Sequence, residues 1–263
     1  TLGVVTTATE KFPEISFDLS VIDIYGTHAV MAALKNIKRN HRLLTISTAN
    51  KELLTTEIKN KVKKIEILNS KEIRKLYGNS NSHQGIILNT TVLEQIGIDE
   101  IFKKTKKNIK EIIVMLDQVS DPNNIGSIMR SCLMFNCRTV IVAKDNSPEI
   151  TPSLAKAASG AVEKINYVKV TNLSRTIREF KKNNFWVCGL ENNINNVKKE
   201  FKIPKKCLLI LGAEGKGMRS LTKKECDKII SIPMIANEDY GVESLNVSNA
   251  CSIALYEHFK NYC

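Results

Sequence analysis

The stretch Asp117–Arg130, DQVSDPNNIGSIMR, decides the fold of the chain around it. It follows the apolar run EIIVML at residues 111–116 and precedes apolar residues at helical spacing. Ser120-Asp121-Pro122 is typical of a turn, and Asn123 or Asn124 is suited to cap the helix, because a short side-chain oxygen accepts from free backbone N–H groups. We therefore expect a strand, a polar turn and a helix. Polar side chains would then lie at the carboxyl end of a strand, where open α/β sheets bind ligands.

Two later segments have the same organisation, an apolar run followed by a polar loop. Leu208–Gly217, LLILGAEGKG, enters a glycine-rich turn, and Ile230–Met234, ISIPM, leads through a polar loop to Glu243–Ala250, ESLNVSNA, and a final helix. The glycine-rich turn has neither the spacing nor the early position of a dinucleotide-binding fingerprint, and it is not a P-loop. It is a loop whose glycines let the backbone approach a flat ligand closely.

The rest of the chain alternates between predicted helices and strands. In the first part we expect a helix from residue 26 whose apolar face includes Ile37, then strands at 43–47, 65–68 and 83–88 and helices at 50–62 and 71–77. In the second part we expect strands at 111–116, 138–143, 165–170, 185–189, 207–211 and 229–233, and helices near 124–135, 151–159, 173–183, 217–227 and 246–261. This pattern predicts a flexible leader (1–20), a small α/β domain (21–95), a basic linker with few apolar anchors (96–110) and a larger α/β domain with a mainly parallel sheet (111–263).

The composition of the 263 residues limits the class of protein. No apolar run approaches the roughly 20 residues that span a bilayer, and the first residues do not resemble a signal peptide. The seven cysteines form no C-x-x-C pair and the four histidines have no metal-ligand spacing, so we expect reduced thiols, no metal and a cytoplasmic location. The net charge of +12 favours a polyanionic partner, although scattered lysines also form ordinary solvated faces.

The segments DPNNIGSIMR, LGAEGKG and IPM…SLNVSNA together resemble the three signature motifs of the SpoU family of RNA 2′-O-methyltransferases, which is part of the SPOUT class. The match is specific because the motifs are long and occur together in this order. The resemblance implies a domain that binds S-adenosyl-L-methionine, forms a homodimer and closes with a carboxyl-terminal trefoil knot, a feature that general topology rules would exclude. The chain departs from the family in the loop 235–243, which is longer than usual.

The same resemblance implies roles for individual residues. The implied cofactor contacts are Gly212, Ile232, Met234 and Leu245, and the implied catalytic set is Asn124, Arg130, Glu214, Ser244 and Asn246. Without the resemblance, Ile232 and Leu245 would be interpreted as core residues and Asn246 as a helix cap. Methyl transfer to a ribose 2′-hydroxyl needs in-line approach and removal of the hydroxyl proton. A guanidinium is a poor base, so we expect Arg130 to bind phosphate and stabilise the oxyanion, while Glu214 is either the base or a group that orients Arg130 through a bidentate pair.

The amino-terminal part extends the resemblance. Tyr25–Val30, YGTHAV, and His83–Ile86, HQGI, look like the two ends of the substrate-binding domain of the branch that modifies large-subunit ribosomal RNA, a domain similar to small RNA-binding ribosomal proteins. The resemblance therefore implies 2′-O-methylation of a ribose, with guanosine as the expected nucleoside, in large-subunit rRNA. Transfer RNA is the alternative substrate. A ribosome-assembly factor that binds RNA without catalysis is the rival function, and loss of Asn124, Arg130 or Glu214 would favour it; all three are present.

Overall fold

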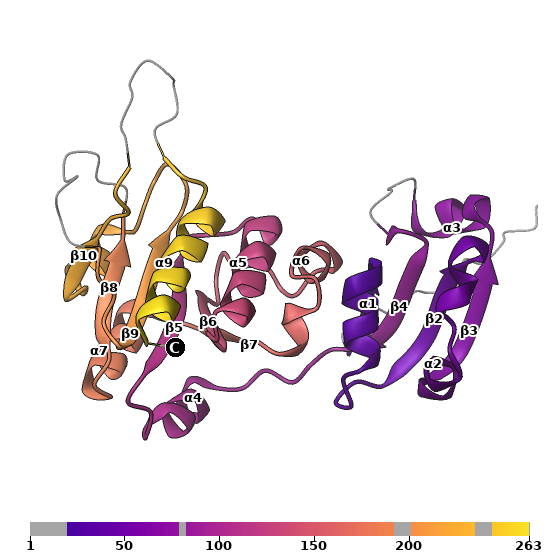
Figure 1. Ribbon diagram of the computed structural model, residues 1–263, viewed down its shortest axis with the longest axis horizontal. Helices are drawn as coiled ribbons and strands as arrows, with labels where there is room; N and C mark the ends of the chain where they lie inside the picture. Colours follow the sequence, from indigo (N-terminus) through magenta and orange to yellow (C-terminus); the bar gives the residue numbers. More distant parts are fainter. Residues whose placement is uncertain (1–19, 79–82, 192–200, 235–243, 263) are drawn as a thin grey trace, which may run out of the picture.

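The computed structural model describes residues 20–78, 83–191, 201–234 and 244–262. The chain forms two α/β lobes, each built on its own sheet (Figure 1). Most of the predicted leader, the loop 235–243 and Cys263 lie outside the described residues. Within the described parts, no helix is long and apolar enough to cross a membrane.

The amino-terminal sheet is mixed and has four strands. Its order is β1 (Val21–Tyr25), β4 (Ile86–Thr91), β2 (His41–Ser47) and β3 (Val62–Leu68), with β4 antiparallel to β1 and β2, and β2 parallel to β3. The helices of this lobe are α1 (Thr27–Leu34), η1 (Thr48–Leu53), α2 (Thr56–Lys61) and α3 (Ser70–Tyr77). The α/β class predicted for this part of the chain is confirmed, although we had not predicted β1.

Two of our predictions for this lobe are wrong. The helix expected over residues 50–62 is divided into η1 and α2, because the side chain of Thr55 accepts a hydrogen bond from the backbone N–H of Ile58 and starts a new helix there. The first helix ends at Leu34, so Ile37 lies beyond it and is 97% exposed instead of belonging to the apolar face.

The carboxyl-terminal sheet has six parallel strands. Their order is β10 (Lys228–Ile230), β8 (Trp186–Leu190), β9 (Lys206–Gly212), β5 (Glu111–Asp117), β6 (Thr139–Ala143) and β7 (Asn166–Val170). The chain leaves β5 toward β6 and β7 and later returns to the other side of β5 through β8 and β9. The boundary between β5 and β9 is therefore the switch point at which open parallel sheets bind ligands.

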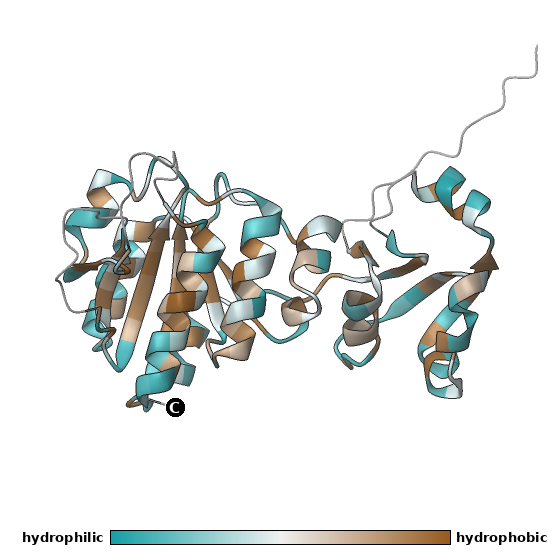
Figure 2. Cartoon of the chain, turned by 45° about the horizontal axis from the view of Figure 1, so that its top comes forward, coloured by the Kyte–Doolittle hydropathy of each residue, from teal (hydrophilic) through white to brown (hydrophobic). Residues whose placement is uncertain are grey.

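Helices cover both faces of this sheet. Side chains alternate along β5, so that Val114 and Leu116 face α5 (Pro122–Met134), α6 (Pro152–Ala157) and α9 (Val247–Tyr262). Ile113 and Met115 face the opposite layer, which contains α4 (Ile98–Thr105) and α7 (Leu173–Lys182). Figure 2 shows the resulting contrast between apolar strands and the polar outer sides of the helices.

Part of the stretch predicted as a basic linker is the helix α4. Ile101 is fully buried, and the ring of Phe102 meets the ring of Phe180 edge-on at 4.8 Å between centroids. The expectation of few apolar anchors is therefore wrong. The apolar side of α4 packs on one face of the sheet, and its lysines lie on the opposite, outer side of the helix.

A buried ion pair joins the two lobes. Arg39 Nε and Nη2 contact Glu163 Oε2 and Oε1 at 2.8 and 2.9 Å, and the two side chains are at most 4% exposed. Asn36 also donates to Glu163, and α1 packs on α6 nearby. Because a bidentate guanidinium–carboxylate pair demands one geometry, this contact defines how the lobes meet.

Candidate functional site

The turn after β5 is organised by Asp121. Its carboxylate accepts hydrogen bonds from the backbone N–H groups of Asn123 and Asn124 at 3.1 and 3.4 Å, and Pro122 occupies the first helical position of α5. Our prediction that Asn123 or Asn124 caps the helix is therefore wrong. Since Asp121 does the capping, the side chain of Asn124 is free to point toward the loop after β9.

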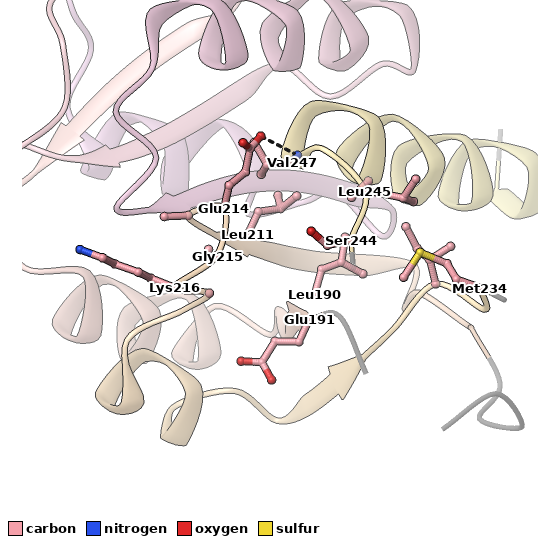
Figure 3. Close-up of a pocket in the computed structure, with 15 residues that line it drawn as sticks. Leu190, Glu191, Leu211, Glu214, Gly215, Lys216, Met234, Ser244, Leu245 and Val247 are labelled. Atoms are coloured by element: carbon pink, nitrogen blue, oxygen red, sulfur yellow. Dashed lines mark hydrogen bonds between the residues drawn. The ribbon is translucent and has the colours of Figure 1, made fainter. Parts of the chain in front are cut away.

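Three of the expected catalytic residues meet at one point. Glu214 Oε1 accepts from Asn124 Nδ2 at 3.2 Å and also from Asn246 Nδ2, while Asn246 Nδ2 lies 3.0 Å from Asn124 Oδ1. The backbone N–H of Val247 adds a third donor to Glu214 Oε1 at 3.3 Å (Figure 3). One carboxylate oxygen thus joins the loops that follow β5, β9 and β10, which lie far apart in the sequence.

The glycine-rich loop owes its shape to particular glycines. A Cβ on Gly212 would lie 2.1 Å from the carbonyl carbon of Gly217, so no side chain fits there. Gly215 and Gly217 have φ values of +74° and +65°, a region that other residues rarely adopt. This turn delays the next helix, and α8 covers only Ser220–Lys224 instead of the expected 217–227.

A cavity of about 390 Å³ opens beside this loop. Its lining includes the four expected cofactor residues, Gly212, Ile232, Met234 and Leu245, and two of the expected catalytic residues, Glu214 and Ser244 (Figure 3). The sequence analysis missed Leu190, Glu191 and Lys216, which also line it. Leu190 and Glu191 end β8 beside β9, so the rule that ligands bind at the carboxyl ends of strands could have found them.

Arg130 is not part of this cluster. It is exposed on α5, six positions after Asn124, which is about one and two-thirds helical turns away. Among the described residues there is no ion pair between Arg130 and Glu214, and Glu214 Oε1 is occupied by amide donors instead. The interpretation of Glu214 as a group that orients Arg130 is therefore not supported within one chain.

A buried carboxylate outside the expected set also holds the loops. Asp117, at the end of β5, is fully buried and accepts from the backbone N–H of Arg219 at 2.9 Å and from its Nε at 2.7 Å. It connects the turn after β5 with the segment after the glycine-rich loop. Its position directly after the apolar run EIIVML is the sequence feature that could have indicated this role.

Five of the six described cysteines are buried. Among the described residues, no three His, Cys, Asp or Glu side chains are grouped in a way that could hold a metal ion. The described cysteines are free, and burial raises the pKa of Cys132 and Cys207 well above the usual thiol range. Such cysteines are inert core residues because the thiolate is the reactive form.

Comparison with protein families and known proteins identifies the chain. Residues 111–256 match the SpoU rRNA Methylase family, and residues 24–95 match a family described as RNA 2′-O ribose methyltransferase substrate binding. The 23S rRNA (guanosine-2′-O-)-methyltransferase RlmB of Coxiella burnetii is 34% identical over 239 residues, covering 89% of this chain and 93% of that protein. RlmB of Salmonella typhimurium is 34% identical over 243 residues, covering 89% and 96%.

Solved structures agree on the fold. The SpoU methyltransferase AviRb from Streptomyces viridochromogenes, in complex with AdoMet, has a TM-score of 0.70 at 18% identity and covers 92% of this chain and 90% of its own. An AdoMet-bound rRNA methyltransferase from Sinorhizobium meliloti has a TM-score of 0.70 at 19% identity, covering 93% and 88%. The family match covers more than half of the chain and the relatives align over most of their length. The chain therefore belongs to the SpoU rRNA methylase family.

Proposed function

We propose that this protein transfers a methyl group from S-adenosyl-L-methionine to the 2′-oxygen of a guanosine ribose in large-subunit ribosomal RNA. The observation that carries this function is the meeting of Asn124, Glu214 and Asn246 at the edge of the 390 Å³ cavity. The RlmB relatives, which are named for 23S rRNA guanosine, support the choice of substrate.

The cavity suits the proposed cofactor. Its volume lies within the roughly 300–1,000 Å³ range of small-molecule sites, and it combines apolar walls with exposed backbone groups of a glycine-rich loop. We assign Gly212, Ile232, Met234 and Leu245 to hold the cofactor. Gly212 has no Cβ, which lets the backbone of Gly217 and Met218 pack directly against it and gives the loop its shape. When bound, S-adenosyl-L-methionine supplies an electrophilic methyl group on its sulfonium.

The polar residues divide into positioning and charge-stabilising roles. Glu214 is a positioning residue, because its Oε1 keeps Asn124 and Asn246 in one arrangement, and Ser244 lines the cavity beside them. Glu214 Oε2 makes no hydrogen bond to another described residue, so a role as proton acceptor is the alternative. Arg130 binds the RNA phosphate and stabilises negative charge on the 2′-oxygen, for which a rigid guanidinium is well suited.

A second copy of the chain is the proposed partner in assembly. Met134, at the end of α5, is 70% exposed, and Tyr256 and Phe259 of α9 are 53% and 37% exposed. The ring of Phe135 packs edge-on against the ring of Tyr256 and tilted against that of Phe259, with centroids 5.9 and 6.0 Å apart, so these residues form one aromatic cluster on an apolar surface. Monomeric proteins rarely leave such aromatic surfaces uncovered. We propose that a homodimer covers it.

The dimer would complete the site. Arg130 precedes Met134 by one helical turn, so it lies at the edge of the apolar surface. In a two-fold dimer both copies bury the same surface, so we propose that α5 of each copy faces α9 of the other. The first turn of α9 lines the cavity through Val247 and Ala250. We therefore propose that Arg130 acts at the cavity of the partner.

The remaining family features stay proposals for this chain. We propose the domain boundaries stated above, with residues 21–95 binding RNA in the manner of small ribosomal proteins and residues 111–263 as the methylase domain. We also propose the carboxyl-terminal trefoil knot; residues 192–200 and 235–243 of this domain lie outside the described residues. The proposed location is the cytoplasm, where bacterial-type ribosomal RNA is modified.

Methyl transfer from labelled S-adenosyl-L-methionine to unmodified large-subunit RNA, small-subunit RNA and bulk tRNA tests the function. We expect label in large-subunit RNA at a 2′-oxygen of guanosine, recognised by resistance of the adjacent phosphodiester bond to alkali. Label in tRNA alone would support the alternative substrate. Binding of RNA without label in any fraction, including assembling ribosomal particles, would support the assembly-factor function and contradict the enzyme.

A further inference from the structure

A second cavity lies in the amino-terminal lobe, at the carboxyl end of β2. Its volume is about 270 Å³, and the residues around it include Ser47, Asn50, Ser70, Arg74, His83 and Gly85. It is separate from the methylase cavity, and nothing in the proposed chemistry uses it. Its walls come from β2, η1, α3 and the turn before β4 (Figure 1).

The turn that forms one wall has an unusual backbone conformation, which hydrogen bonds hold in place. Gln84 and Gly85 have consecutive positive φ values of 53° and 70°, and a Cβ on Gly85 would lie 2.6 Å from Ser47 Oγ. Two hydrogen bonds hold the turn: Asn50 Nδ2 donates to the carbonyl of Gln84 at 2.7 Å, and the backbone N–H of Thr27 donates to Gln84 Oε1 at 2.9 Å. Backbone strain of this kind persists where the surrounding structure enforces it, often at ligand sites.

His83 presents an unpaired polar atom at this wall. The backbone N–H of Gly85 donates to Nδ1 at 3.0 Å, so the neutral ring carries its proton on Nε2. Nε2 is buried and has no hydrogen-bond partner among the residues that the structure describes. Because buried polar groups are almost always paired, the ring needs an acceptor that the described chain does not provide. An acceptor on a ligand in the cavity, which His83 lines, would satisfy it.

Arg74 supplies a charge at the rim. It is exposed in the last turn of α3, and among the described residues its guanidinium has no hydrogen bond or ion pair. A guanidinium binds phosphate through two parallel N–H donors. The cavity thus combines a phosphate-binding group, the hydroxyls of Ser47 and Ser70, and the apolar side chain of Ile73.

This combination fits one nucleotide. We propose that the cavity holds a single unpaired nucleotide of the substrate RNA, with its phosphate on Arg74 and an acceptor of its base or ribose on His83 Nε2. Unpaired nucleotides are the usual targets of specific RNA recognition, because their base edges are accessible. The proposal rests on the proposed function and adds a contact that selects the RNA.

Two neighbouring cations on α3 provide the test. Arg74→Gln and Lys75→Gln remove the same charge one residue apart, but only Arg74 borders the cavity. With the full chain and unmodified large-subunit RNA, we expect Arg74→Gln to weaken equilibrium binding about tenfold or more, as for loss of a charged hydrogen-bonded pair. We expect Lys75→Gln to weaken it only about two- to threefold and to lower the salt dependence by about one charge. Binding of S-adenosyl-L-methionine and the thermal midpoint should not change in either variant.

A variant that keeps the charge completes the test. Ser70→Leu fills the cavity from the first turn of α3, and we expect it to weaken RNA binding and raise KM while kcat and the thermal midpoint remain close to wild type. Equal weakening by Arg74→Gln and Lys75→Gln, together with wild-type binding by Ser70→Leu, would overturn the proposal. That result differs from failure of the proposed function, in which the wild-type protein itself would methylate no RNA.

Discussion

The two ends of α5 differ in how completely the chain surrounds them. At its amino-terminal end, Asp121 caps the helix and Asn124 is tied to Glu214 and Asn246. At its carboxyl-terminal end, Arg130 and Met134 are exposed, and the described residues leave Tyr256 and Phe259 of α9 partly exposed beside them. The polar groups at one end are held by contacts within the chain, whereas the exposed groups at the other end are those for which we propose contacts with RNA and with a second chain.

The two polar residues of the motif DPNNIGSIMR, Asn124 and Arg130, therefore have different environments. The asparagine and the arginine of one motif lie on the same helix, but they point to different surroundings. Asn124 is hydrogen-bonded to Glu214, which lines the cavity of the same chain, whereas Arg130 is exposed. The difference leads to separate expectations for variants at the two ends and in the structures that support them.

The largest effect on activity is expected at the carboxyl-terminal end of α5. Arg130→Ala should lower kcat about 10²- to 10³-fold, because a donor to the developing oxyanion is worth that much. Affinity for S-adenosyl-L-methionine should not change, since Arg130 does not line the cavity. Arg138→Ala, which removes an exposed arginine just after the same helix, is the control and should retain activity. Steady-state methyl transfer would be measured for both variants. Equal loss of activity in Arg138→Ala and Arg130→Ala would contradict the role proposed for Arg130.

Two substitutions of Glu214 test the amino-terminal end of α5. Glu214→Ala removes the acceptor that holds Asn124 and Asn246, and we expect kcat/KM to fall about 10²-fold from misplacement of these groups. Glu214→Gln keeps an acceptor oxygen for the same donors, so it should lose less than about tenfold. A glutamine variant as inactive as the alanine variant, with unchanged cofactor binding, would show that Glu214 accepts the proton.

The apolar surface beside Arg130 is tested by its assembly. Tyr256→Asp places a charge in the centre of the proposed interface, and we expect it to weaken dimerisation at least about 30-fold, as for a central aromatic contact. Leu221→Asp is the matched control, because Leu221 is 57% exposed, close to the 53% of Tyr256, but lies on α8. Light scattering across a range of protein concentrations would measure both. The same mass distribution for Tyr256→Asp and wild type would contradict the proposed interface.

The contact between the lobes should contribute stability rather than chemistry. Arg39→Met leaves Glu163 buried without its partner, and we expect a loss of about 3–5 kcal/mol in the free energy of unfolding. Adding Glu163→Met should recover part of it, because two apolar groups avoid the unpaired charge. Arg178→Met is the control, since Arg178 is 58% exposed in its pair with Glu225 and should cost at most about 1 kcal/mol. Chemical denaturation would show whether the buried pair differs from the exposed one.

The smallest effect is a pH dependence of stability that arises from His258, near the carboxyl-terminal end of α9. Burial lowers the pKa of His258 below its ordinary value of 6.5, so the folded chain binds this proton less readily than the unfolded chain. Stability from this group is therefore present above about pH 6.5 and is lost as pH falls toward the folded pKa, by up to about 1.4 kcal/mol per pH unit. The difference in unfolding free energy between wild type and His258→Asn, measured from pH 7.5 to 5.5, isolates this contribution. A difference that did not change with pH would contradict it.

The strands of the methylase domain could be predicted because each is a short apolar run. The run EIIVML and its counterparts bury both faces of a parallel sheet, and that environment leaves little choice of residue. Helix starts were less predictable, since Asp121, Asn123 and Asn124 all have oxygens that can cap a helix. Only the position of Pro122 at the first helical residue distinguishes them.

Long-range contacts could not be predicted from local patterns. Glu214 lies 90 residues from Asn124, and Arg39 lies 124 residues from Glu163. The resemblance to a family placed Asn124, Glu214 and Asn246 in one site, because the motifs carry that information without the geometry. The roles of the site residues stay predictions, and no motif indicated the ion pair between the lobes or the carboxylate of Asp117. Such contacts depend on how the sheets pack, which a sequence pattern does not specify.

Mixing two inactive variants would test the account most directly. Arg130→Ala keeps a complete cavity, and Glu214→Ala keeps the arginine, so a dimer of the two has one complete site if Arg130 acts on the partner's cavity. Random exchange of subunits then restores about a quarter of wild-type methyl transfer to large-subunit RNA, since half of the dimers are mixed and each has one working site. A mixture that stays inactive, although exchange of subunits is demonstrated, would contradict the proposed division between the two ends of α5.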